Sequence, residues 1–221
     1  MKHVAGKRTN RVTSATPDRG IIEDHLGLER LIFFSDAVFA IAVTLLALEI
    51  RLPDATDLDN DAQLLAALAA LGPKYFSYVI SFLVIGSYWL VHHRSFRHIV
   101  RYDRRLLMLN LLLLMVVAFL PFPSSVIGES NSRVATIFYA LTMVITGLLS
   151  AMIWLHAHRH GRLTDQQLAP PVFRQGLLRS LIPPAIFLIS IALAYIDSDL
   201  ARYSWISIAF VSLLLRQTTS R

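Results

Sequence analysis

The 221-residue chain contains no cysteine, and only 16% of its residues are charged. Neither disulfides nor thiol chemistry is available to it, and the redox compartment of the protein is left open. Soluble domains carry roughly 25% charged residues, which is well above the charged fraction of this chain. Hydrophobic residues make up 55% of the chain. The composition therefore predicts a membrane protein.

Phosphate-binding sequence patterns are also missing. No GxxxxGK[ST] or GxGxxG segment occurs, and the stretches between apolar runs are too short for a nucleotide-binding domain. An ATP-driven pump and a membrane-tethered dehydrogenase are thus disfavoured. The net charge of +6 does not gather on a soluble surface, so no nucleic-acid partner is predicted.

Runs that are nearly free of charge predict an all-α membrane protein with six spanning helices. The expected spans cover approximately residues 30–51, 73–96, 104–123, 133–157, 176–196 and 200–216. Pro121 and Pro123 are expected to close the third span, and Pro183 and Pro184 to open or kink the fifth. Segment 62–71 is too short to span, so we expect a short amphipathic or re-entrant piece.

The distribution of charge predicts the orientation of the spans. Lysine and arginine concentrate in the segment through Arg30, in 94–105, in 159–179 and at the C-terminus, whereas the alternate loops are acidic. The positive-inside rule then places both termini in the cytoplasm. We expect a mobile basic leader over 1–28 without a cleavable signal peptide, a six-span unit over 29–216, and a tail over 217–221.

The first span, RLIFFSDAVFAIAVTLLALEI, carries a polar pair, Ser35 and Asp36. Such groups in a membrane need a partner or a function, so they predict either a buried hydrogen-bonded anchor or a proton relay or ion site. The expected partners are donors and cations near the inner ends of spans one and two: Arg30, Trp89, His92 and His93.

Helical spacing separates this pair from an apolar stripe on the same helix. The stripe consists of the residues that fall within about 60° of Ile41 at about 100° per residue: Phe34, Ala37, Ile41, Thr44, Leu45 and Leu48. Ser35 and Asp36 point away from it. The pattern fits ordinary helix packing, and it also fits the lining of a pore.

The spacing Arg30-xxx-Phe34-Ser35-Asp36 resembles the signature of the transmembrane protein 175 family of lysosomal potassium channels. The apolar continuation through LALEI, the Trp89–His93 segment and the six-span layout extend the resemblance over nearly the whole chain. Ala37 stands where the family often has glycine. Because alanine is almost as small, close helix approach is preserved.

The resemblance implies a homotetramer in the cell membrane of a prokaryote, with span one of each subunit lining a central pore. It implies that Arg30, Phe34, Ser35 and Asp36 tie span one to its neighbours, together with Trp89, His92 and His93. It further implies an apolar constriction at Ile41, a hydroxyl layer at Thr44, and apolar layers at Leu45 and Leu48. The protein would be no enzyme and need no cofactor, and K⁺ would be the permeant ion.

The sequence offers no TVGYG-like segment, so a filter of backbone carbonyls is not expected. Glu49, together with the acidic loop that follows, predicts a cation-attracting outer vestibule. The other interpretation of Glu49 is a solvated helix end.

Three other interpretations stay open. Asp36 and His93 could exchange protons in a secondary transporter, although no inverted repeat is visible. Ser35, Asp36 and a neighbouring histidine (His92 or His93) have the residue types of a hydrolytic triad, but adjacent residues on a helix diverge. His156 and His160 have the spacing of metal ligands on a helix. We expect them to form a solvated helix end at a basic membrane boundary instead of a metal site.

Overall fold

The computed structural model describes residues 19–53, 59–159, 163–164 and 169–208. Within these ranges every regular element is a helix, apart from one isolated bridge between Ile99 and Thr164. The helices are α1 (Arg19–Leu48), α2 (Asp61–Ala70), α3 (Gly72–Phe96), α4 (Arg104–Phe119), α5 (Pro121–Glu129), α6 (Arg133–Arg159), α7 (Pro170–Leu193) and α8 (Ser198–Ser204). The prediction of an all-α protein is confirmed.

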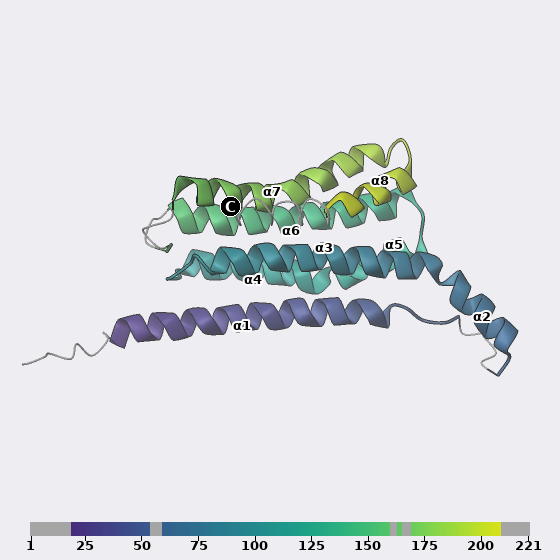
Figure 1. Cartoon of the computed structure of the whole chain (residues 1–221), viewed down its shortest axis with the longest axis horizontal. Helices are drawn as coiled ribbons and strands as arrows, with labels where there is room; N and C mark the ends of the chain where they lie inside the picture. The colour runs from purple at the N-terminus through teal and green to yellow at the C-terminus, as the bar shows by residue number, and fades with distance from the viewer. Residues whose placement is uncertain (1–18, 54–58, 160–162, 165–168, 209–221) are drawn as a thin grey trace, which may run out of the picture.

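The long helices run roughly parallel to one axis in three layers (Figure 1). One layer holds α6, α7 and α8, the middle layer holds α3, α4 and α5, and α1 lies alone on the other side. The contacts follow this order, because α1 packs on α3 and α4, α4 packs on α6, and α6 packs on α7. The first helix therefore forms an edge of the bundle.

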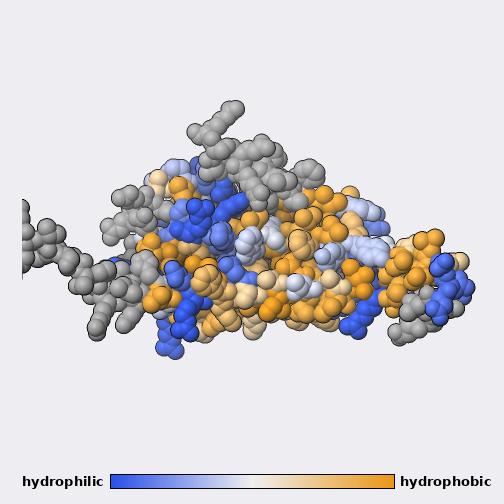
Figure 2. Space-filling view, turned by 60° about the horizontal axis from the view of Figure 1, so that its bottom comes forward, coloured by the Kyte–Doolittle hydropathy of each residue, from blue (hydrophilic) through white to orange (hydrophobic). Residues whose placement is uncertain are grey.

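Five helical stretches of 23 to 27 residues are apolar enough to cross a membrane, which needs about 20 residues. They are Leu26–Leu48, Gly72–Phe96, Arg104–Glu129, Arg133–Arg159 and Pro170–Leu193. Figure 2 shows hydrophobic side chains over most of the long middle of one face and hydrophilic side chains toward its ends. The protein is a multi-pass membrane protein.

The predicted sixth span, 200–216, lies mostly outside the described residues. Helix α8 and the helical turn that follows it, as far as residue 208, form its first part. The segment predicted over 62–71 corresponds to α2 (Asp61–Ala70), a ten-residue apolar helix that is too short to span. Asn60 caps α2 by accepting hydrogen bonds from the backbone N–H groups of Ala62 and Gln63.

The first helix begins earlier than predicted. The expected leader over 1–28 is interrupted at Arg19, where α1 begins, and α1 ends at Leu48 instead of residue 51. Residues 19–29 contain no proline, so the backbone can extend its helical hydrogen bonds beyond the apolar segment. At the other end Arg51 Nε donates to the carbonyl of Leu48 at 3.1 Å, which satisfies a terminal carbonyl.

The proline pairs act differently from each other. Pro121 and Pro123 do not close the third span, because α4 ends at Phe119 and α5 continues to Glu129. Proline is tolerated in the first turn of a helix, where its missing N–H has no partner to lose. Pro183 and Pro184 lie inside α7, whose ribbon changes direction along its length (Figure 1). This agrees with the predicted kink.

Helices α6 and α7 approach closely where a glycine meets the second proline of that pair. A Cβ atom added to Gly147 would lie 2.6 Å from Cγ of Pro184. The proline ring is rigid, and both residues are buried. The close packing of these two helices therefore depends on the missing side chain of Gly147.

We predict that Gly147→Ala lowers the melting temperature of the purified protein, because α6 and α7 must separate to accept the methyl group. Overpacking of this kind costs about 1–3 kcal/mol. The matched control is Gly86→Ala in α3, where an added Cβ meets nothing within 4 Å. The control should be neutral or slightly stabilising, and equal melting temperatures for the two variants would contradict this packing.

Candidate functional site

Helix α1 has one buried face and one exposed face. Phe39, Ala42 and Leu46 are at most 2% exposed and pack toward α3 and α4. The predicted apolar stripe lies on the other face, where Ile41 is 58% and Leu48 is 60% exposed. Phe34 and Leu45 are exposed as well. The residues proposed from spacing as a pore lining thus share one face that the rest of the subunit leaves uncovered.

Thr44 is the hydroxyl on this exposed face. Its Oγ1 donates to the carbonyl of Ile41 at 2.8 Å, so the hydroxyl proton is directed back into the helix. A hydroxyl oxygen keeps acceptor lone pairs when its proton is engaged. The Thr44 oxygen therefore keeps acceptor lone pairs on the exposed face of α1.

The polar residues of the opposite face form a buried chain of hydrogen bonds. Asn110 Nδ2 donates to Ser35 Oγ at 2.9 Å, and Asn110 Oδ1 lies 2.9 Å from His92 Nε2. Ser35 in turn donates to the carbonyl of Leu31 at 2.8 Å. Ser35 and Asn110 are fully buried and His92 is 3% exposed. This chain joins α1, α4 and α3 at one level.

Asp36 belongs to a second, separate contact. Trp89 Nε1 donates to Asp36 Oδ1 at 2.8 Å, and the ring of Trp89 stacks on His93 with centroids 5.4 Å apart. His93 itself is exposed. The structure thus places Trp89 against Asp36 and joins Ser35 to His92 through the amide of Asn110.

Arg30 does not complete this network within one subunit. Its side chain is exposed, and it forms no hydrogen bond or ion pair with any residue in the described part of the chain. A long arginine side chain near the end of a membrane span, here Leu26–Leu48, can reach the aqueous boundary instead of a buried carboxylate. In the described part of the chain, Arg30 therefore does not act as the cation of this network.

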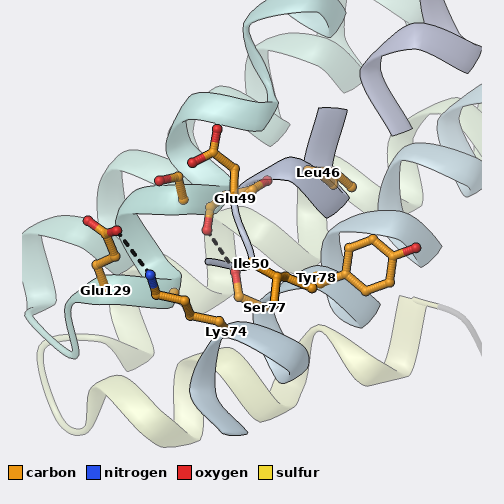
Figure 3. Close-up of a pocket in the computed structure, with 10 residues that line it drawn as sticks. Leu46, Glu49, Ile50, Lys74, Ser77, Tyr78 and Glu129 are labelled. Carbon is orange, nitrogen blue, oxygen red and sulfur yellow. Dashed lines mark hydrogen bonds and ion pairs between the residues drawn. The ribbon is translucent and has the colours of Figure 1, made fainter. Parts of the chain in front are cut away.

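Glu49 lies in a small pocket at the end of α1, between α3 and α5 (Figure 3). Lys74 and Glu129 also line this pocket and form an ion pair at 3.4 Å. Ser77 Oγ donates to the carbonyl of Ser124 at 2.7 Å, which joins α3 to α5. Glu49 is half-buried here and does not lie on the exposed stripe.

His156 is held by a carboxylate that its own segment does not contain. His156 Nε2 lies 2.9 Å from Asp103 Oδ2, and only 10% of the His156 side chain is exposed. The same Asp103 accepts from the N–H of Leu106 at the start of α4. The interpretation of a solvated helix end is wrong for His156, because the fold brings Asp103 to it. His160 lies outside the described residues, and those that are described hold no cluster of three or more potential metal ligands.

Comparisons with known proteins agree with this arrangement. Residues 30–121 match the family model described as endosomal/lysosomal potassium channel TMEM175. A Streptomyces collinus protein named as a potassium channel is 41% identical over 172 residues, which cover 76% of this chain and 82% of that protein. The zebrafish endosomal/lysosomal proton channel TMEM175 is 29% identical, and the match spans 98% of this chain but 46% of the zebrafish protein.

A solved structure matches the same family. The crystal structure of a lysosomal potassium-selective channel TMEM175 homologue from Chamaesiphon minutus superposes with a TM-score of 0.72 at 30% identity. The match covers 85% of this chain and 97% of that one. Both matches agree with the family resemblance found in the sequence.

We predict that Asn110→Leu destabilises the protein by about 1–3 kcal/mol, because Ser35 and His92 would each lose a buried hydrogen-bond partner. Thermal unfolding in detergent measures the change. The matched control is Leu111→Ala on the same helix, where the side chain is 48% exposed and little should change. Similar melting temperatures for Asn110→Leu and wild type would contradict the bridging role of Asn110.

Proposed function

Since the chain belongs to the endosomal/lysosomal potassium channel TMEM175 family, we propose that it is a passive, K⁺-preferring leak channel. The observation that supports this most directly is the exposed apolar stripe of α1 with a single hydroxyl layer. A membrane helix that packs on only one side has its other face available for symmetry-related copies or for a pore.

We propose that four copies of the chain surround the pore, with α1 of each copy innermost. Closed cyclic symmetry buries the same face of every subunit, and α1 is the helix that lies at an edge of the bundle. Small residues on that face, Ala37 and Ala40, allow neighbouring α1 helices to approach closely. The layered packing of α3, α4 and α6 behind α1 supplies a scaffold for this arrangement.

Selection would take place at rings of side chains. Four Ile41 side chains form an apolar constriction that an ion passes only by losing water, and K⁺ holds its hydration shell less tightly than Na⁺ does. Four Thr44 oxygens, with their protons directed to the carbonyl of Ile41, offer partial replacement for that water. Leu45 and Leu48 extend the apolar lining. We expect weaker discrimination between K⁺ and Na⁺ than in a filter of backbone carbonyls.

The distribution of charge supports the proposed orientation of the chain in the membrane. Both termini lie in the cytoplasm of a prokaryotic cell, and the chain resides in its cell membrane, as the distribution of Lys and Arg supports. Glu49 lies at the outer mouth and attracts cations. Passive conduction needs no cofactor, and K⁺ is the permeant ion.

A proton-coupled or cation transporter that uses Asp36 and His93 is the second candidate. It is favoured by the position of Asp36, which is half-buried and has only Oδ1 in a hydrogen bond among the described residues. The name of the zebrafish relative as a proton channel also makes proton movement worth measuring. Against this candidate, Asp36 is held by Trp89, as expected of a structural contact.

We predict that the protein in liposomes gives a K⁺-directed reversal potential under a K⁺/Na⁺ gradient, and that Thr44→Ala weakens it. Loss of the hydroxyl layer removes the oxygens that replace water, so the K⁺/Na⁺ preference should fall several-fold while conduction persists. The matched control is Thr142→Ala, because that threonine is buried in α6 and bonds the carbonyl of Phe138.

A different pattern would overturn the channel proposal. Flux that saturates at low ion concentration, requires a pH gradient and is unchanged in Thr44→Ala would support the transporter. Asp36→Asn further separates the channel from the transporter. The amide oxygen of asparagine can still accept the hydrogen bond from Trp89, but the side chain can no longer carry a proton.

A further inference from the structure

A buried arginine lies at the end of the bundle that holds α2, α5 and α8. Arg202 is 7% exposed, and its guanidinium donates three hydrogen bonds. Nε reaches Thr136 Oγ1 at 3.0 Å, Nη1 reaches Asn131 Oδ1 at 2.7 Å, and Nη2 reaches the carbonyl of Ser130 at 2.6 Å. All three acceptors are neutral, so none of them offsets the charge.

No carboxylate in the described part of the chain forms an ion pair with Arg202. Asp199 is the acidic residue that acts on it electrostatically, without reaching ion-pair distance. Buried charges in proteins are normally paired. A guanidinium has five N–H groups, so two remain after the three hydrogen bonds above.

Arg202 borders a cavity of about 340 Å³, a volume within the range of ligand sites. Gly72 and Phe76 from the start of α3 form one wall, and Asp199, Tyr203 and Trp205 from α8 and its end form another. The indole N–H of Trp205 is buried and has no hydrogen-bond partner among the described residues. A ligand with acceptor oxygens would offer partners to such donors.

The aromatic side chains place this cavity at a membrane boundary. Phe76 and Tyr203 meet edge to face with ring centroids 5.6 Å apart, and both are exposed. Tyrosine and tryptophan concentrate where hydrocarbon meets headgroups. The Ser130–Asn131 segment that holds Arg202 is itself the connection between two spans, which is where a headgroup would lie.

We propose that this cavity binds a phosphate group, with Arg202 as its cation. Arginine matches the geometry of phosphate oxygens and binds them with charge-assisted hydrogen bonds. The phosphate could belong to an anionic lipid of the surrounding leaflet or be free in solution, and the chemistry at Arg202 is the same. The site is separate from the exposed face of α1 and does not depend on the function proposed above.

The test measures the melting temperature of the purified full-length protein in neutral detergent. Dioleoylphosphatidylglycerol, zwitterionic dioleoylphosphatidylcholine and inorganic phosphate are titrated separately. A concentration-dependent rise with phosphatidylglycerol alone identifies a lipid phosphate, and a rise with inorganic phosphate identifies a free one. Equal responses to the two lipids, together with none to inorganic phosphate, would overturn the proposal.

Three variants separate binding from folding. Arg202→Gln should weaken the response about tenfold or more, because a charge-assisted hydrogen bond is lost. It could also loosen α8, so Gly72→Leu is compared with Gly72→Ala. An added Cβ at Gly72 meets nothing within 4 Å, and only the leucine projects far enough to obstruct the cavity. Equal ligand responses in the two Gly72 variants would contradict the site.

Asp199→Asn should raise the affinity for the phosphate ligand, whereas Arg202→Gln lowers it. Removing the carboxylate that lines the cavity takes away its repulsion of an anion, so the apparent affinity for the phosphate ligand should rise several-fold. A merely structural role of Arg202 gives no reason for this increase. An unchanged or lower affinity in Asp199→Asn would count against the proposal.

Discussion

The arrangement of this protein depends on how α1 is fixed to its neighbours in a medium that offers no water to polar groups. Two contacts do this at one level of the bundle: the buried chain from Ser35 through Asn110 to His92, and the hydrogen bond from Trp89 to Asp36. A helix rotates by about 100° for each residue of register. A change of one residue would therefore break both contacts at once, so the polar pair determines which face of α1 is turned away from the subunit.

The face that remains is apolar and uncovered, and we propose that it meets copies of the same helix. Ile41 and Leu48 are exposed there, and Thr44 directs its proton into its own helix. Association of helices in a membrane relies on packing and on hydrogen bonds, because lipid tails are as apolar as leucine. The rest of the bundle holds α1 in position, through α4 against α6 and through the close approach of Gly147 to Pro184.

Local pattern in the sequence was sufficient for much of this arrangement. Charge-free runs predicted the five spans that the structure describes. Helical spacing separated the apolar stripe from Ser35 and Asp36, and residue chemistry named Trp89 and His92 as partners. The failures concern long-range contacts. The sequence interpretation of His156 missed Asp103, 53 positions away, and Arg30 was assigned to a network that its side chain does not reach. Pro121 was expected to end a helix that in fact resumes at that residue, because proline is compatible with a first turn.

The absence of cysteine makes a direct test of the pore face possible. Single-cysteine variants at Ile41 and, as control, at Leu148 on α6 would be reconstituted in liposomes and exposed to silver ions during K⁺ flux. Both side chains are exposed in the subunit, at 58% and 46%, but only Ile41 belongs to the proposed lining. The account predicts that silver abolishes flux through Ile41→Cys and leaves Leu148→Cys and the cysteine-free protein unchanged. Persistent flux through silver-treated Ile41→Cys would contradict it.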